Sequence, residues 1–211
     1  MSVPFIAVEG PIGVGKTTLA MAIADEQKFH PLREIVDENP FLNKFYENIE
    51  EWSFQTEMFF LCNRYKQLGD IKKNYLSQQI PVVADYHLFK NLIFARRTLP
   101  AEEFRKYEEI YHILLRDMPA PNIIIYLHAS LDTLQKRIDM RGRDFEKHIA
   151  PSYLEQLSLD YEQFMMDFEN THPEIIVLRF NGDELDFVDS EEDLRMILRQ
   201  VDETIRKGET R

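Results

Sequence analysis

The stretch Phe5-Ile-Ala-Val-Glu-Gly10-Pro-Ile-Gly-Val-Gly-Lys16-Thr17-Thr18 decides the fold. It opens with a short apolar run that is typical of a buried β-strand, and a glycine-rich turn follows. Residues 17–26 then have the composition of a helix. From Gly10 to Thr17 the sequence matches the spacing G-x-x-x-x-G-K-[ST], which is the signature of a phosphate-binding loop, or P-loop.

The residue types of this motif fit a nucleotide triphosphate. Glycines at positions 10, 13 and 15 let the backbone approach phosphate oxygens closely, and the following helix adds its positive N-terminal dipole. We expect Lys16 to contact the β- and γ-phosphates and the Thr17 hydroxyl to bind Mg²⁺. The ATP-binding set is therefore Gly10, Gly13, Gly15, Lys16, Thr17 and Thr18. A plain glycine turn before a helix is the alternative, and the Lys and Thr in register disfavour it.

Further apolar runs alternate with segments of helical spacing. The expected strands are Phe5–Glu9, Val82–Asp85, Asn122–His128 and Ile175–Phe180, with a weaker fifth candidate at Arg33–Val36. The expected helices are Thr17–Glu26, Ser53–Gln79, Glu102–Asp117, Leu131–Arg141, Pro151–Glu169 and Glu191–Arg206. This alternation predicts an α/β fold, a parallel sheet with helices on both faces, and ligands at the carboxyl ends of its strands. Ser190 and Asp193 form a candidate capping box for the last helix.

Composition limits the classes of function. The chain has 211 residues, and its net charge of −12 argues against nucleic-acid binding but not against a small phosphorylated ligand. Without a linker or repeat, a single domain over 1–211 is expected. Cys62 is the only cysteine, so no internal disulfide is expected, which fits a reducing cytoplasm. We expect neither a signal peptide nor a membrane span.

Two acidic positions are candidates for chemistry at the strand ends. Asp85 follows an apolar run and suits a magnesium shell, although a loop-capping role is the alternative. Glu34 follows the weak strand candidate, where a carboxylate could accept a proton from an attacking hydroxyl. Asp37 and Glu38 compete with Glu34 for this role, and spacing alone does not choose among the three.

Two helical segments carry candidate binding groups. Gln55, Met58 and Cys62 have the spacing i, i+3, i+7 and share one helix face, where the Gln amide could pair with a base edge. A core helix with one tolerated Gln is the alternative. Arg137 and Arg141 are spaced i, i+4 and could converge on one anion together with Arg143. Arginines there could neutralise a transferring phosphoryl group, whereas a solvated basic helix end is the alternative.

Taken in order, these motifs resemble the deoxynucleoside kinase family over most of the chain. Apart from the P-loop, it is their order and spacing that carry the resemblance rather than any single motif. They are residues 6–18, Glu34-Ile-Val, Asn39-Pro-Phe-Leu, Lys44-Phe-Tyr46, Glu51-Trp-Ser-Phe-Gln55, Ala84-Asp-Tyr-His87, Arg141-Gly-Arg-Asp-Phe-Glu146 and Ser152-Tyr-Leu-Glu155. The resemblance implies a P-loop kinase fold with a five-stranded parallel sheet. It also implies a homodimer in the cytoplasm or an organelle, with the cytoplasm expected here.

The resemblance implies a role for each matching residue. Glu34 would be the general base for the 5′-hydroxyl of a deoxynucleoside, Gln55 would read the base, and Tyr46 and Glu146 would hold the 3′-hydroxyl. Catalytic roles fall to Glu34, Lys16 and Arg137. The ATP phosphates would meet Arg137, Arg141 and Arg143, the last two in a lid near 141–150. Asp85 joins Thr17 at the metal, and the base end has Met58, Cys62, Arg64 and Asn91 as candidates.

The resemblance implies transfer of the γ-phosphate of ATP to a deoxynucleoside. Deoxyguanosine is the expected acceptor, and deoxyadenosine or deoxycytidine is the alternative. One motif departs from the family pattern. Much of the family has an acidic residue, Arg and Ser where this chain has Asp85-Tyr86-His87. In the family that arginine supports the general base and the 5′-oxygen, and Lys90 or another cation could replace it here.

Two other functions compete. A nucleoside monophosphate kinase would need arginines for the acceptor phosphate, but residues 34–62 contain one cation, Lys44. A guanine-nucleotide switch would carry Asn-Lys-x-Asp, whereas Asn43-Lys44 continues as Phe-Tyr. Both alternatives are therefore disfavoured.

Overall fold

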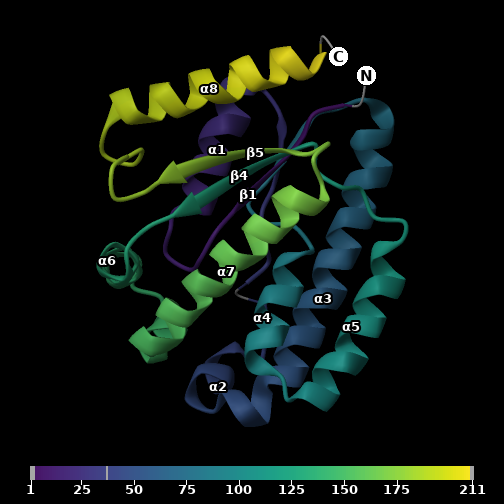
Figure 1. Ribbon diagram of the computed structural model, residues 1–211, viewed down its shortest axis with the longest axis vertical. Helices are drawn as coiled ribbons and strands as arrows, with labels where there is room; N and C mark the ends of the chain where they lie inside the picture. The colour runs from purple at the N-terminus through teal and green to yellow at the C-terminus, as the bar shows by residue number, and fades with distance from the viewer. Residues whose placement is uncertain (1–2, 37, 210–211) are drawn as a thin grey trace.

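Five parallel strands form the centre of the molecule in the computed structural model, which describes residues 3–36 and 38–209, the last two without their side chains (Figure 1). The strand order is β2-β3-β1-β4-β5, and each neighbouring pair is parallel. The strands are β1 Phe5–Glu9, β2 His30–Leu32, β3 Val82–Ala84, β4 Ile123–His128 and β5 Ile176–Asn181. The expected five-stranded parallel sheet is confirmed.

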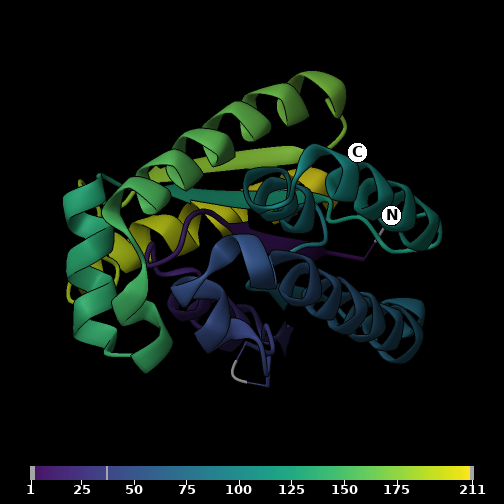
Figure 2. The same ribbon diagram turned by 90° about the horizontal axis from the view of Figure 1, so that it is seen from below.

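Helices cover both faces of this sheet (Figures 1 and 2). They are α1 Lys16–Gln27, α2 Leu42–Glu47, α3 Ile49–Asn74, α4 Lys90–Thr98, α5 Ala101–Leu115, α6 Leu131–Arg141, α7 Pro151–Thr171 and α8 Glu191–Glu209, with 3-10 turns η1 Leu76–Gln78 and η2 Asp144–His148. On β4, Ile125 packs with α1 and α8, whereas Ile124 and Tyr126 pack with α4 and α7. Successive side chains of a strand point to opposite faces of the sheet, so a continuously apolar strand contributes to the hydrophobic cores on both faces.

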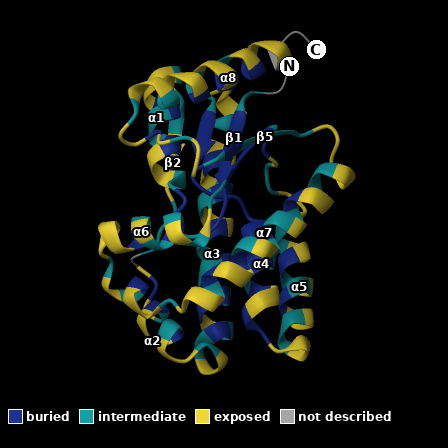
Figure 3. Cartoon of the chain, turned by 60° about the vertical axis from the view of Figure 1, so that its left-hand side comes forward, coloured by how far each residue is buried: buried dark blue, intermediate teal, exposed yellow. Residues whose placement is uncertain are grey.

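Burial follows these layers. The strands are largely buried, and the helices turn their exposed residues outward (Figure 3). None of the helices in the described part of the chain is long and apolar enough to cross a membrane.

Some element predictions were wrong at particular places. The second strand lies at His30–Leu32 rather than at 33–36, because Leu32 is the last residue that pairs with β3 before the chain leaves the sheet. The short helices α2 and α4 were missed, and in α4 the buried Lys90 and Asn91 interrupt the apolar stripe. The cap of the last helix is half confirmed: the Asp193 N–H donates to Ser190 Oγ at 3.2 Å, but the Asp193 carboxylate accepts from the Asp186 N–H.

The P-loop is wedged against the end of β4 and α6. Gly10 has φ 145°, and a Cβ there would lie 2.2 Å from the carbonyl oxygen of Leu127. At Gly13, with φ 86°, a Cβ would lie 2.8 Å from the carbonyl oxygen of Leu134. Only glycine meets both demands, a left-handed backbone and no space for a side chain. Two of the motif's glycines are thus required by packing as well as by the ligand.

The segment after β3 places His87 in the core. Its N–H donates to Glu9 Oε1 at 2.5 Å, and its ring nitrogen Nε2 lies 3.2 Å from the Pro119 carbonyl oxygen. The ring packs near Phe5 and Phe89, and Nδ1 is buried without a hydrogen-bond partner among the described residues. Burial therefore lowers the pKa of His87 from 6.5 to about 4.

His87 should make stability depend on pH. Because its pKa is lower in the folded state, the unfolded chain takes up the proton first as the pH falls. The stability that the folded protein gains from keeping His87 neutral is fully present above pH 6.5 and is lost as the pH falls through about 4. Denaturant titrations over this pH window measure the free energy of unfolding. Between pH 6.5 and 4, this free energy should fall by up to about 3 kcal/mol less in His87→Gln than in the wild type. His148→Gln, at an exposed histidine, is the control; parallel curves for wild type and His87→Gln would contradict this account.

Candidate active site

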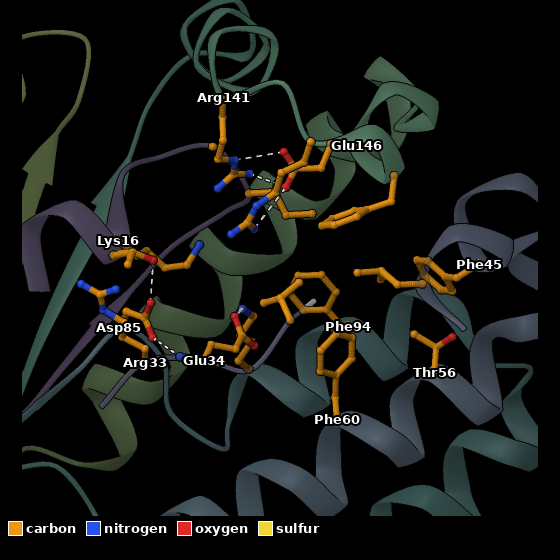
Figure 4. Close-up of a pocket in the computed structure, with 18 of the residues that line it drawn as sticks. Lys16, Arg33, Glu34, Phe45, Thr56, Phe60, Asp85, Phe94, Arg141 and Glu146 are labelled. Atoms are coloured by element: carbon orange, nitrogen blue, oxygen red, sulfur yellow. Dashed lines mark hydrogen bonds and ion pairs between the residues drawn. The ribbon is translucent and has the colours of Figure 1, made fainter. Parts of the chain in front are cut away.

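A cavity of about 440 Å³ opens at the carboxyl ends of β1, β2 and β3 (Figure 4). Its walls come from the P-loop, the start of α1, the segments after β2 and β3, α2, α3, α4, and the chain from the end of α6 into η2. This is where a parallel sheet exposes its loops and helix N-termini, and the volume suits a small ligand. The sequence-predicted residues that line it are Gly13, Gly15, Lys16, Thr17, Thr18, Glu34, Tyr46, Arg64, Asp85, Lys90, Arg141, Arg143 and Glu146.

Lys16 lies at the P-loop end of the cavity. Its Nζ donates to the carbonyl oxygens of Gly10 and Pro11, both at 2.8 Å. Burial, and to a smaller extent the charge of Lys90, lower the pKa of this amine. An anion bound at this position would therefore stabilise the charged amine.

Thr17 and Asp85 form a hydroxyl–carboxylate pair beside the loop. Thr17 Oγ1 donates to Asp85 Oδ2 at 2.5 Å, and Asp85 Oδ1 accepts from the Glu34 N–H at 2.7 Å. Burial raises the pKa of Asp85. Both partners offer the oxygen ligands that Mg²⁺ prefers. Residues 3–36 and 38–209 contain no cluster of three or more His, Cys, Asp or Glu that could hold a metal.

Glu34 is a carboxylate between two cations, and its side chain is only 10% exposed. Oε1 accepts from Nε of Arg64 at 2.9 Å and also from its Nη2, and Oε2 accepts from Lys90 Nζ at 2.8 Å. Burial alone would raise the pKa of Glu34, but Arg64 and Lys90 outweigh it and hold the pKa well below its ordinary range. The carboxylate is therefore ionised. Of its two competitors, Glu38 is exposed and Asp37 lies outside the described residues.

The departure at Asp85-Tyr86-His87 is explained by α4. The Tyr86 hydroxyl donates to Gln67 Oε1 at 2.7 Å, and neither Tyr86 nor His87 lines the cavity. Lys90, at the first position of α4, provides the cation for Glu34 instead.

Tyr46 and Glu146 lie together on the wall between α2 and η2. The buried Glu146 carboxylate accepts from Arg141 Nε at 3.0 Å and Nη2 at 2.5 Å, and Arg143 Nη1 lies 3.8 Å from it. Burial and the charge of Glu146 raise the pKa of Tyr46, so its phenol stays neutral. The ring of Phe145 runs parallel to that of Tyr46, with centroids 6.4 Å apart.

Arg137 lies behind the P-loop rather than in the cavity. It donates to the carbonyl oxygens of Val14 at 3.2 Å and Gly182 at 2.9 Å. The predicted contact of Arg137 with the ATP phosphates does not fit this placement, because Arg137 is not among the residues that line the cavity. Arg141, one turn further along α6, does line the cavity, so the pair does not converge on one anion.

The opposite end of the cavity is aromatic. Phe60 and Phe94 lie between Glu34 and the end formed by Phe45 and Thr56 (Figure 4). A flat, weakly polar group fits between such rings.

Gln55 does not reach this end. Gln55 and Cys62 are exposed, and Met58 packs against the core beside α3. The cavity face of α3 carries Glu57, Phe60 and Arg64. They have the same i, i+3, i+7 spacing as the predicted set that starts at Gln55, but each lies two residues further along the helix. Two residues turn a helix by about 200°, so the face expected from Gln55 points away from the cavity. Asn91 is buried but donates to the Tyr107 hydroxyl at 2.8 Å and does not line the cavity.

Sequence reasoning missed Glu57, Thr56, Phe60 and Phe94. A usable signal was present in α3. Glu57 and Arg64 are charged residues seven positions apart on a face that also carries the apolar Leu61 and Leu68. Charges on a buried face are retained mostly where they have partners or a ligand.

Comparisons with known proteins agree with this geometry. A model of the family "Deoxynucleoside kinase" matches residues 6–206. The deoxyguanosine kinase of Bacillus subtilis (strain 168) is 54% identical, over 96% of this chain and 98% of that protein. The deoxyadenosine/deoxycytidine kinase of the same organism is 29% identical, over 97% of this chain and 94% of that protein. The fold is shared with deoxyadenosine kinase from M. mycoides with bound dCTP, at a TM-score of 0.79 and 23% identity, over 94% of this chain and 99% of that one. Because the family match spans nearly all of its residues, the chain belongs to the deoxynucleoside kinase family.

Proposed function

We propose that this deoxynucleoside kinase transfers the γ-phosphate of ATP to the 5′-hydroxyl of deoxyguanosine, which yields dGMP and ADP. The observation that carries the proposal is the ionised Glu34, which shares one cavity with Lys16 of the P-loop. The identity with the Bacillus subtilis deoxyguanosine kinase supports deoxyguanosine as the acceptor. Family membership also leads us to propose a cytoplasmic homodimer and one kinase domain over 1–211.

The phosphate donor would occupy the P-loop end. Backbone N–H groups of the loop and the Lys16 amine would hold the β- and γ-phosphates. Thr17 and Asp85 would hold Mg²⁺, which supplies neutralisation of phosphate charge when bound. Arg141 and Arg143 lie at the cavity wall in the proposed lid near 141–150, where they would face the same phosphates. Arg137 supports the loop through the Val14 carbonyl rather than by touching ATP.

The acceptor would lie between Glu34 and the aromatic end. Glu34 accepts the proton of the 5′-hydroxyl as the oxygen attacks the γ-phosphate. A carboxylate of low pKa suffices, because phosphoryl transfer has a loose transition state and catalysis depends on position more than on base strength. Tyr46 and Glu146 would hold the 3′-hydroxyl, so that both sugar hydroxyls fix the nucleoside.

A panel of acceptors tests the proposed reaction. With MgATP, deoxyguanosine should have a higher kcat/KM than deoxyadenosine, deoxycytidine or thymidine, and dGMP should not be phosphorylated. Phosphate transfer to monophosphates alone would contradict the acceptor assignment. Preference for another deoxynucleoside would retain the mechanism and change the base.

Glu34→Gln should lower kcat by about 10²- to 10⁴-fold, because the amide cannot accept the proton. Binding of deoxyguanosine, measured by calorimetry, should change little, since the amide keeps the size of the side chain. Glu38→Gln, in the same segment but exposed, is the matched control and should leave kcat near wild type. Equal kcat values for Glu34→Gln and wild type would reject Glu34 as the base.

Lys90→Met should lower kcat by about tenfold or more, because Glu34 loses one of the two cations that fix it. The variant should also unfold at a lower temperature, since a buried carboxylate is left less well paired. Lys90→Arg should restore most of both properties. Arg96→Met, at an exposed position of the same helix, is the control. Wild-type kcat in Lys90→Met would show that Lys90 does not support the base.

A further inference from the structure

Glu57 is a buried acidic side chain at the aromatic end of the cavity. It lies on α3, is 2% exposed and lines the cavity, although no role in phosphate transfer falls to it. Oε1 accepts one long hydrogen bond, from Thr98 Oγ1 at 3.3 Å. Its other oxygen, Oε2, has no hydrogen-bond partner among the described side chains. A carboxylate with up to four acceptor positions is thus left with one weak donor.

This environment is costly for an ionised carboxylate. Burial raises the pKa of Glu57 to about 7, and the charge of Arg64 offsets only part of that effect. Buried acceptors are normally satisfied, and an unsatisfied one facing a cavity marks a place where a ligand supplies the donors. The ligand that fits Glu57 carries two adjacent N–H groups, one for each oxygen.

The neighbours of Glu57 define the rest of that ligand. Phe60 and Arg64 follow it at i+3 and i+7 on the same face of α3. Phe60 and Phe94 provide aromatic surface for a flat ring (Figure 4). The Nε and Nη2 atoms of Arg64 donate to Glu34, whereas its Nη1 is buried without a partner in the described part of the chain. The end of the cavity therefore offers an acceptor pair, a spare donor and a planar apolar slot.

We infer that Glu57 is the residue that selects guanine. The guanine N1–H and N2–H₂ groups are adjacent donors and would pair with the two carboxylate oxygens, while O6 would accept from Arg64 Nη1. Adenine has a bare N1 and no N2 amine, so its ring nitrogen would face an oxygen of the ionised Glu57 carboxylate without a proton between them. Cytosine presents the same conflict at N3. This inference rests on the proposed function, since it assigns the base contact of that same acceptor site.

The direct test exchanges the carboxylate for an amide. Glu57→Gln keeps the size of the side chain and its contact with Thr98. The amide can donate to adenine N1 and accept from its N6–H, whereas it can accept only one of guanine's two donors. The ratio of kcat/KM for deoxyguanosine over deoxyadenosine should fall by roughly 10- to 100-fold.

Gln55→Leu is the matched control, because Gln55 lies on the same helix but faces solvent. It should leave the deoxyguanosine/deoxyadenosine ratio unchanged. An unchanged ratio in Glu57→Gln, with wild type still preferring deoxyguanosine, would overturn this inference while the proposed function stands. A wild type that phosphorylates no deoxynucleoside would overturn both.

A measurement on the wild-type protein alone avoids any effect of substitution on folding. Deoxyinosine keeps O6 and N1–H but lacks the N2 amine. Its kcat/KM should lie between those of deoxyguanosine and deoxyadenosine, because one of the two donors to Glu57 is missing. Equal values for deoxyinosine and deoxyguanosine would show that the N2 amine has no partner in the site, which would contradict the paired contact.

Discussion

The pairing of Glu34 with Arg64 and Lys90 is the constraint on which the rest of the site depends. A buried carboxylate is tolerated only when cations and donors compensate for the lost water, and here they come from α3 and α4. The Glu34 backbone N–H also donates to Asp85, whose other oxygen accepts from Thr17. One run of polar contacts thus joins the P-loop, the end of β3, the segment after β2 and two helices. It fixes the distance between the phosphate cradle and the proposed base.

Local charge explains how an acidic protein can hold ATP. The net charge is −12, yet the cavity wall gathers Lys16, Arg64, Lys90, Arg141 and Arg143. Several of these cations already have carboxylate partners, so the wall is not a bare basic patch. Such paired cations stay ordered and can still stabilise charge that develops during phosphate transfer. The aromatic end, by contrast, has the under-satisfied carboxyl group of Glu57. The basic end therefore favours the phosphates of the donor, and the aromatic end favours the base of the nucleoside.

Sequence was sufficient where the signal is local. The P-loop spacing and the apolar runs predicted four of the five strands, both ends of α6, and the closeness of Thr17 and Asp85. The sequence was insufficient where the position of a site residue depends on which face of a helix turns inward, or on a contact between residues far apart in the chain. The inward face of α3 depends on packing against α4 and α5, so Gln55 could not be told from Glu57 by spacing. The contact between Lys90 and Glu34 joins residues 56 positions apart, and no periodicity reports it.

A double-mutant cycle on Glu34→Gln and Lys90→Met tests the central claim, that Lys90 acts through the Glu34 carboxylate. The quantity to measure is kcat/KM for deoxyguanosine in wild type, both single variants and the double variant. If the claim holds, the double variant should be about as slow as Glu34→Gln alone, because Lys90 has nothing left to position. Losses that multiply would mean that the two residues act independently and would contradict the account.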